Sequence, residues 1–330
     1  MSDTTVVAVA GEVITDLVPA GPGGLMRAAA GGSPANVAIG LARLGVPTRL
    51  LARLSDDALG RRLRSHLEAN AVPLNHAVTA SEPSSLAIVT LGSDGAAAYD
   101  FRVDGTADWQ WSDAELERSL AADADGEVCA LHVGSLAMVL EPGASALRRL
   151  VERARTLVTI TFDPNVRPLL MGNRDETLPR IEELVAAADV VKASAEDIEW
   201  LHPGVDPEAV AKRWLRQGPA LVVVTLGEDG VLAVGRAAGM IRRPAVPVGV
   251  VDTVGAGDSF MSALLTGLAD AQLLGGAHRE RLGAAGVATV VSVLDQAALA
   301  AALTCGRPGA DPPTRADLDR AAARRATGSS

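Results

Sequence analysis

Short apolar runs alternate with amphipathic segments along the middle of this chain, between about residues 113 and 235. An apolar run bounded by polar residues is typical of a buried strand, whereas apolar residues three or four positions apart are typical of a helix. Their alternation predicts parallel βαβ units, with right-handed crossovers and helices on both faces of the sheet. The expected helices are 114–122, 144–154, 176–187 and 207–217, and the expected strands are 130–133, 158–162, 190–192 and 221–225.

The N-terminal pattern predicts two extended segments followed by a helix. Branched apolar residues predict a buried strand over Thr5–Ala10, and a second extended segment follows over residues 13–18. A helix then opens at Ser33, which suits the N-cap position, with Pro34 in the first turn. The apolar stripe of this helix consists of Val37, Leu41 and Leu44.

Residues 85–108 have a different pattern, in which alternating strands are broken by turns. The clearest of these strands are 86–91 and 97–103. Together with residues 13–30 they predict a small second sheet that lies over the main one. Trp109 and Trp111, just beyond it, are interpreted as packing residues.

Length and composition indicate one large domain. The 330 residues are 48% hydrophobic and 21% charged, which is enough for a single extensive core. We expect this domain to cover residues 1–312. Residues 313–330 would form a C-terminal helix or tail, with about the last ten residues exposed to solvent.

Charge and cysteine usage exclude several classes of partner. With 30 Lys+Arg against 40 Asp+Glu, the formal charge of −10 argues against nucleic acid as the main partner. Cys129 and Cys305 lie far apart and outside any CxxC motif, so neither a disulfide framework nor a zinc site is indicated. We find no signal leader and no run of about 18 apolar residues, which predicts a cytoplasmic protein without a membrane partner.

The stretch Asp252-Thr-Val-Gly-Ala-Gly-Asp258 carries the most specific chemistry of the chain. Three small residues, Gly255, Ala256 and Gly257, let backbone N–H groups approach an anion closely. Apolar residues recur at helical spacing from Phe260 onward, so we expect a helix to begin at or just after Asp258. A helix N-terminus is a favourable place for a phosphate. The alternative is that Asp258 merely caps this helix.

This stretch resembles the second signature of the ribokinase-like (PfkB) carbohydrate kinases, Asp-Thr-x-Gly-Ala-Gly-Asp at the start of a helix. The resemblance implies that Asp258 is the catalytic base. It also implies that Gly255, Ala256 and Gly257 form the anion hole, and that a potassium ion binds beside them at Asp252 and the Val254 carbonyl.

A second resemblance lies in the N-terminal part. Gly31-Gly32-Ser-Pro-Ala-Asn36 is similar to the first signature of the same family, in which the glycine pair and the asparagine hold sugar hydroxyls. Asp16 follows the first strand, where ligands of open α/β sheets gather, so it is a candidate hydroxyl acceptor. Its alternative interpretation is a solvated turn residue.

The choice of sugar depends on two arginines. Asp163-Pro-Asn165-Val-Arg167 resembles a segment of the fructokinase and 2-keto-3-deoxygluconate kinase branches, which implies Asn165 and Arg167 as sugar contacts. Arg167 could hold a hydroxyl or, in a charge-assisted fork, a carboxylate. Arg102 is the other candidate, but a one-residue shift on its strand would turn it away from the sugar. We therefore expect fructose ahead of the keto acid.

The resemblance also implies a nucleotide site and a magnesium site. The expected nucleotide contacts are Lys192, Ser194, Thr225, Gly227, Gly230 and Ala298. Asp197 would organise Mg²⁺ through water, with Glu196 as its rival. The alternative for both acids is a favourable place in the first turn of a helix.

Taken together, the resemblance implies a ribokinase-like α/β fold, with a mostly parallel doubly wound sheet, helices on both faces and a small β lid. It implies ATP-dependent phosphorylation of a small sugar, with ATP, Mg²⁺ and K⁺ as cofactors and a homodimer formed through the lid. Three alternatives stay open: a 2-keto-3-deoxygluconate kinase, a catalytically idle sugar- or nucleotide-binding regulator, and a nucleotide-dependent oxidoreductase. The missing GxGxxG motif counts against the last of these.

Overall fold

The computed structural model describes residues 5–21, 25–91, 97–120 and 126–328. Its main sheet has eight strands in the order β14-β13-β12-β11-β10-β9-β1-β4. The neighbours from β4 to β12 are parallel, while β13 and β14 are antiparallel to their neighbours. The strand bounds are β1 Thr5–Ala10, β4 Thr48–Leu51, β9 Glu127–Gly134, β10 Thr159–Asp163, β11 Val190–Ser194, β12 Leu221–Thr225, β13 Val231–Gly235 and β14 Gly239–Arg243.

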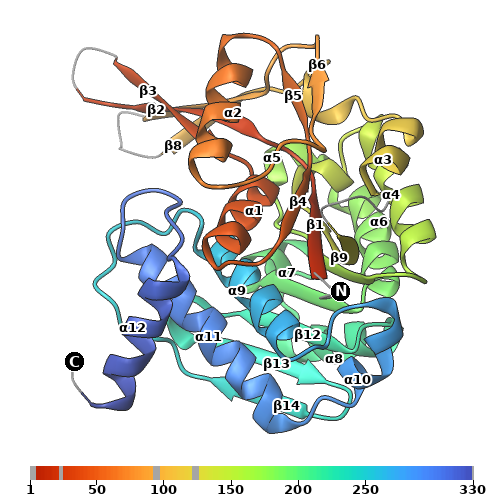
Figure 1. Cartoon of the computed structure of the whole chain (residues 1–330), viewed down its shortest axis with the longest axis vertical. Helices are drawn as coiled ribbons and strands as arrows, with labels where there is room; N and C mark the ends of the chain where they lie inside the picture. Colours follow the sequence, from red (N-terminus) through yellow and green to blue (C-terminus); the bar gives the residue numbers. More distant parts are fainter. Residues whose placement is uncertain (1–4, 22–24, 92–96, 121–125, 329–330) are drawn as a thin grey trace.

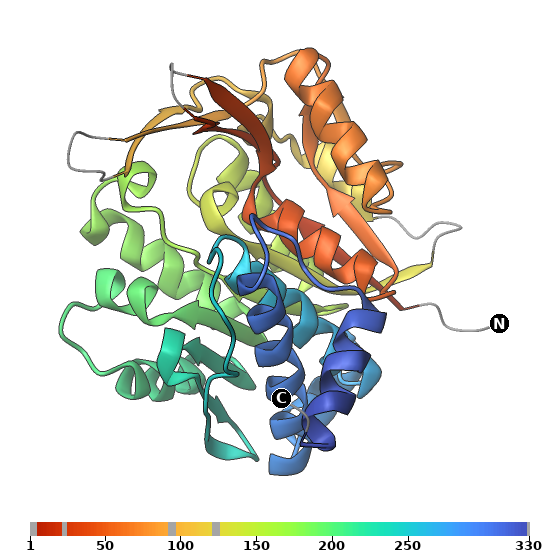
Figure 2. The ribbon, with the colours of Figure 1, turned by 90° about the vertical axis from the view of Figure 1, so that its left-hand side faces the viewer.

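Helices cover both faces of this sheet (Figure 2). Side chains alternate along β1, so that Val7 and Val9 join one buried cluster with α1, α9 and α11. Val6 and Ala8 join a second cluster with α4, α6 and α8. The helices are α1 Ser33–Arg43, α2 Ala58–Ala69, α3 Asp113–Leu120, α4 Gly143–Ala154, α5 Pro168–Met171, α6 Arg174–Ala187, α7 Ala195–Leu201, α8 Pro207–Gln217, α9 Ala256–Asp270, α10 Arg279–Gly283, α11 Val287–Cys305 and α12 Arg315–Ala326.

The predicted alternation of strands and helices is confirmed, with boundaries that differ by a few residues. The expected helix 114–122 is α3, and its last two expected residues lie outside the described residues. Two helices begin earlier than the sequence indicated. Gly32, not Ser33, is the N-cap of α1, and α9 begins at Ala256, with Gly255 as its N-cap.

The small second sheet is also confirmed, at the top of Figure 1. Its strand order is β3-β2-β7-β8, with β2 and β7 parallel and the outer pairs antiparallel. The bounds are β2 Ile14–Pro19, β3 Met26–Gly31, β7 Leu86–Leu91 and β8 Ala97–Arg102. A separate two-stranded sheet pairs β5 Arg53–Ser55 with β6 Val78–Ala80. We call the four-stranded sheet the lid.

The C-terminal part contains two helices, α11 and α12. Among the described residues one helix, α11, is long and apolar enough to cross a membrane by length and composition. No uninterrupted apolar run was found because Asp295 and Gln296 lie within it. In the structure α11 packs against α9, β14 and α12, as a core helix does. The expected solvated tail is helical as far as Ala326 in α12, although its last turns are exposed.

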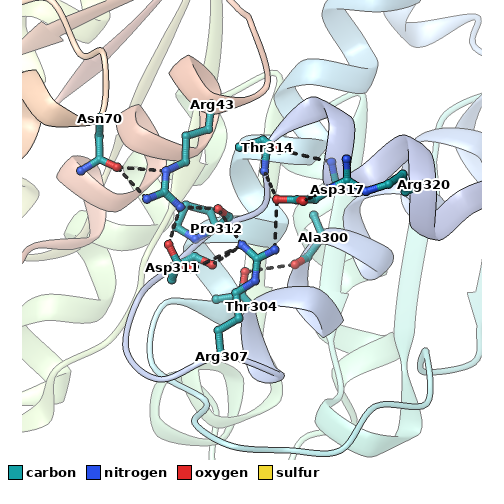
Figure 3. Close-up of polar contacts among 10 residues, drawn as sticks. All are labelled: Arg43, Asn70, Ala300, Thr304, Arg307, Asp311, Pro312, Thr314, Asp317 and Arg320. Carbon is teal, nitrogen blue, oxygen red and sulfur yellow. Dashed lines mark hydrogen bonds and ion pairs between the residues drawn. The ribbon is translucent and has the colours of Figure 1, made fainter.

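The segment between α11 and α12 is bound to the N-terminal helices (Figure 3). Arg43 of α1 forms an ion pair with Asp311 at 2.5 Å and donates to the Pro312 carbonyl at 2.6 Å and to Asn70. Arg307 pairs with Asp317 at 3.0 Å, at the start of α12. These contacts fix the 306–314 segment, which packs against the Asp252–Asp258 loop.

Candidate active site

Asp258 lies where the first turns of two helices meet. It is the third residue of α9, and its carboxylate makes no capping hydrogen bond at the start of that helix. Instead its Oδ1 accepts a hydrogen bond from Ser33 Oγ at 2.6 Å, and its Oδ2 accepts one from Asn36 Nδ2 at 2.8 Å. Both donors lie in the first turn of α1. A carboxylate has about four acceptor positions, so Asp258 can still accept a substrate hydroxyl.

There is little space for side chains at the two glycines of the 252–258 loop, which we call the anion loop. Gly255 has φ 75°, in the left-handed region, and a Cβ there would lie 2.6 Å from the Ala310 side chain. A Cβ on Gly257 would lie 3.0 Å from Lys192 Nζ. Larger side chains would therefore displace either the 306–314 segment or Lys192. The loop keeps its N–H groups at the positive end of α9, where an anion is stabilised.

Lys192 forms a buried ion pair behind the loop. Its Nζ lies 2.9 Å from Asp163 Oδ2, and both side chains are almost fully buried. Burial opposes the charge on Lys192, but Asp163, Asp197 and Asp258 outweigh it and raise its pKa. Burial raises the pKa of Asp163 to about 6, against the effect of Lys192. Lys192 therefore stays cationic beside Gly257, where a phosphate would approach.

Asp197 does not have the surroundings of a metal ligand. It is 5% exposed, and its two oxygens accept the N–H groups of Val166 and Ser194, each at 2.7 Å. Ser194 in turn accepts from Asp197 N at 3.0 Å, which completes a capping box at the start of α7. These contacts are those of a helix-start acid, and the water-mediated magnesium contact of Asp197 stays a prediction. Glu196 is exposed, and its side chain makes no hydrogen bond or ion pair to any described residue.

The sugar-site candidates Asp16 and Arg167 lie close enough to interact. Burial raises the pKa of the Asp16 carboxyl to about 6, and the nearby charge of Arg167 lowers it in part. The Asp16 Oδ2 occupies space that a side chain on Gly31 would fill, because a Cβ there would be 2.2 Å away. Gly31 thus makes room for Asp16, and Gly32 is the N-cap of α1 with φ 103°.

Asn165 is held from the core side of the site. It has φ 40°, and its Nδ2 donates to Ser135 Oγ at 3.2 Å. Arg167 donates to the Val166 carbonyl at 2.9 Å, and its side chain is exposed. The two residues therefore flank the same turn after β10.

Arg102 is not brought together with Asp16. In the lid register Asp16 pairs with Ala87, which pairs with Phe101, so these three side chains share one face. Arg102 is the next residue on β8 and belongs to the opposite face. Its guanidinium is 64% exposed and pairs with Asp100 at 2.8 Å. Arg102 therefore lies on the face of the lid opposite Asp16, which is the arrangement that a one-residue shift gives.

The expected nucleotide contacts are spread along the carboxyl ends of β11 and β12. Ser194 ends β11, and Thr225 ends β12. Gly227 and Gly230 form the turn between β12 and β13, with φ 57° and 91°. A Cβ on Gly230 would lie 2.1 Å from the Arg243 carbonyl, so the turn packs directly beneath the segment after β14. Ala298 lies on α11, mostly buried among apolar residues.

Asp252 joins the anion loop to the 306–314 segment. Its Oδ1 accepts from Val254 N at 3.0 Å, and its Oδ2 accepts from Gly309 N at 2.8 Å. These hydrogen bonds, first the one from Val254, lower the pKa of Asp252. Asp252 is therefore an anion beside the Val254 carbonyl. The potassium site stays a prediction.

Sequence reasoning missed two residues of this site. Ser33 was interpreted as a helix cap, yet its hydroxyl binds Asp258. Asp163 was noted only as part of a motif, yet it neutralises Lys192. The spacing of Ser33 and Asn36 was an available signal, because residues three apart share one face of a helix.

Comparison with known proteins now decides the family. A sequence model described as pfkB family carbohydrate kinase matches residues 4–316.

The chain belongs to this family.

Its relatives point to one branch of the pfkB family. The fructokinase of Rhizobium leguminosarum bv. trifolii is 34% identical over 262 residues, which cover 78% of this chain and 78% of that relative. The crystal structure of a Xylella fastidiosa fructokinase with bound ATP has a TM-score of 0.88 at 26% identity and covers 98% of this chain and 99% of that chain. A Vibrio cholerae O395 fructokinase, with fructose, ADP and calcium bound, has a TM-score of 0.79 at 26% identity, with coverages of 97% and 99%. As a pfkB member the chain is an ATP-dependent sugar kinase.

Proposed function

We propose that this protein transfers the γ-phosphoryl group of ATP to a hydroxyl of fructose. The observation that carries the proposal is Asp258, whose carboxylate is held by Ser33 and Asn36 beside the Gly255–Gly257 loop. A base and an anion hole are thus adjacent on one helix start. Phosphoryl transfer needs this combination of a positioned base and electrostatic stabilisation.

Each of these groups has a distinct role in the reaction. Asp258 accepts the proton of the sugar hydroxyl as its oxygen attacks phosphorus. Ser33 and Asn36 fix the orientation of the Asp258 carboxylate before the reaction. Less conformational entropy of this side chain is then lost on reaching the transition state. The N–H groups of the loop and the cationic Lys192 face the charge that spreads over the phosphoryl oxygens.

Magnesium would neutralise the phosphates and orient the transferred group when it is bound. Among the described residues, no group of three or more His, Cys, Asp or Glu side chains gathers as a metal site. The ion would therefore be held mainly by ATP itself. The exposed carboxylate of Glu196 fits a water-mediated contact better than the buried Asp197 does.

Potassium would fit beside Asp252, whose low pKa keeps a negative charge next to the Val254 carbonyl. The related Vibrio cholerae fructokinase double mutant was crystallised with fructose, ADP and a potassium ion.

Fructose is favoured over 2-keto-3-deoxygluconate by the lid register. A substrate carboxylate would be held best by two guanidinium groups, but Arg102 lies on the face opposite Asp16 and pairs with Asp100. Arg167 is then the one arginine among the sugar-site candidates that lies near Asp16. The fructose bound in the Vibrio cholerae relative supports the same choice.

A coupled ADP-release assay with fructose, 2-keto-3-deoxygluconate and ribose tests this proposal. We expect the highest kcat/KM with fructose. A keto-acid kcat/KM that exceeds the fructose value tenfold, or by about 1.4 kcal/mol of transition-state preference, would overturn the choice of sugar. Sugar binding without ADP release from any sugar would instead indicate the idle regulator.

We also infer that the lid forms the contact of a homodimer. Leu25 and Met26, at the start of β3, are 65% and 41% exposed, and the outer strands of the lid leave edges open to pairing. Light scattering should give twice the mass of the chain, and Met26→Lys should lower it. A wild-type monomer at micromolar concentration would contradict this.

A further inference from the structure

Two buried carboxyl groups, Glu12 and Asp108, lie where the lid joins the core, and the reaction described above uses neither. Each side chain is 2% exposed. The chain crosses between core and lid four times, at the segments that enter β2, leave β3, enter β7 and leave β8. Glu12 lies in the first of these crossings and Asp108 in the last, and each of the other two contacts one of them.

Asp108, in the segment after β8, binds two of the other crossings. Its Oδ1 accepts a hydrogen bond from Val13 N at 2.8 Å, just before β2, and its Oδ2 accepts one from Ser85 Oγ at 2.6 Å, just before β7. The Ser85 hydroxyl also lies 2.5 Å from Thr106 Oγ1, in the segment after β8. One carboxylate thus holds together three strands of the lid at their base.

The Glu12 carboxylate binds the core, and its backbone packs against the crossing after β3. Its Oε2 accepts from Ala137 N at 3.2 Å, and its carboxylate also accepts from the Ser135 hydroxyl. A Cβ on Gly32, in the crossing after β3, would lie 2.4 Å from the Glu12 carbonyl oxygen. The start of α1 is therefore packed directly against the Glu12 backbone.

Neighbours of Glu12 and Asp108 also contact residues that we expect to bind the sugar, or residues next to them. Thr15 N, between Val13 and Asp16 on one strand, donates to the Ser85 carbonyl at 3.0 Å. Ser135, which binds Glu12, also accepts from Asn165 Nδ2 at 3.2 Å. Because a strand is stiff over three residues, the position of Val13 sets the position of Asp16.

We propose that Glu12 and Asp108 are positioning residues that fix the lid on the core and thereby hold Asp16, Gly32 and Asn165 in place for the sugar. This inference rests on the proposed function, because it assumes that these three residues face the sugar.

Burial of two carboxyl groups at one junction is unfavourable in itself. Burial raises the pKa of Glu12 to about 7 and that of Asp108 to about 6, while hydrogen bonds to each partly offset the effect. The two carboxyls also repel each other when both are charged. What the two carboxylates provide is hydrogen-bond acceptors. Asp108 accepts from Val13 with one oxygen and from Ser85 with the other. Asparagine has one acceptor oxygen, so it can keep both partners only if the Ser85 hydroxyl reverses its hydrogen bond and accepts from the new amide.

Steady-state kinetics of Asp108→Asn test the proposal. We expect the KM for fructose to rise about tenfold, or about 1.4 kcal/mol, while the KM for ATP stays within about twofold. Asp189→Asn is the matched control. Asp189 is also a buried carboxylate that accepts a backbone N–H, from Ile160 at 2.9 Å, but it lies at the opposite end of the main sheet and pairs with Arg279. It should lower Tm and leave both KM values unchanged.

Glu12→Gln and Ser85→Ala extend the test. Ser85→Ala removes one donor from Asp108 together with the contact to Thr106. It should give a smaller rise in the fructose KM, and it keeps the test available if Asp108→Asn fails to fold. Equal changes in the KM values for fructose and ATP, or no change in either, would overturn the inference.

Hydrogen exchange without ligand separates this inference from the proposed function. The amides of Val13 and Thr15 should exchange faster in Asp108→Asn than in the wild type, while those of α9 should not. If the wild type phosphorylates no sugar, the proposed function fails, and the exchange rates still decide whether Asp108 holds the lid. Unchanged exchange at Val13 and Thr15 would overturn the inference whatever the activity.

Discussion

The anion loop takes all of its groups from seven consecutive residues, Asp252 to Asp258, whereas the sugar side gathers single residues from β2, the start of α1 and the turn after β10. In the proposed reaction the backbone of the loop is the binding group, and small residues leave it accessible. On the sugar side the binding groups are side chains, and each depends on a different strand or turn for its position.

This difference predicts different responses to substitution. A change in the loop removes a group that acts on the transition state, so turnover should fall while sugar binding persists. A change on the sugar side, or at its supports, should appear first in the KM for fructose. The following substitutions test this comparison, from the largest expected effect to the smallest.

Asp258→Asn should lower kcat by about 10²–10⁴-fold, because it removes the base and keeps the size of the side chain. The KM for fructose should change little. Single-turnover kinetics would separate this loss of chemistry from a loss of binding. Asp270→Asn, at the exposed end of the same helix, is the control and should be near normal. Near-normal turnover of Asp258→Asn would rule out its role as base.

Gly257→Val should lower kcat at least about 10²-fold, which is the order of effect seen when one donor of an anion hole is lost. The new side chain would meet Lys192 Nζ, since even a Cβ would lie only 3.0 Å away. Calorimetric binding of fructose should persist in the variant. Gly249→Ala, three residues before Asp252 with nothing within 4 Å of its new Cβ, is the control. Equal loss of sugar binding and turnover in a folded protein would indicate a structural role.

Asp16 should make the fructose KM depend on pH. Its pKa is raised to about 6 by burial, so it is ionised and accepts hydroxyls above pH 6 and becomes protonated below it. The KM for fructose should therefore rise as the pH falls below about 6, by up to about tenfold per pH unit. Asp16→Asn should weaken this dependence, and the KM for ATP is the internal reference. A flat profile in the wild type would exclude Asp16 as an ionised ligand.

Arg102→Ala should have the smallest effect, with kcat and the fructose KM within about twofold of the wild type. Its exposed ion pair with Asp100 is worth about 0–1 kcal/mol. Arg167→Ala is the paired measurement and should raise the fructose KM about tenfold, since Arg167 lies near Asp16. The reverse order of the two effects would mean that the sugar lies on the other face of the lid.

Local pattern in the sequence determined the alternation of strands and helices, the lid segments and the anion loop. Each of these depends on neighbours a few positions apart, through side-chain periodicity or the conformational freedom of glycine. The loop could be predicted from the sequence because its proposed binding groups are backbone N–H groups of consecutive residues. The apolar content of α11 was less informative, because a core helix and a membrane helix share it.

Tertiary structure alone decided the contacts between distant residues. Ser33 and Asn36 are more than 200 positions from Asp258, so their spacing places them on one face of α1 but does not pair them with Asp258. Asp197 points into the protein and accepts hydrogen bonds from Val166 and Ser194. An exposed acid in the first turn of a helix would have given the same sequence pattern. The face on which Arg102 lies was decided by the register of β7 and β8, because a shift of one residue exchanges the two faces of a strand. Glu12 and Asp108 are single carboxyls in unremarkable segments, and only the convergence of four chain crossings gives them a shared place at the base of the lid.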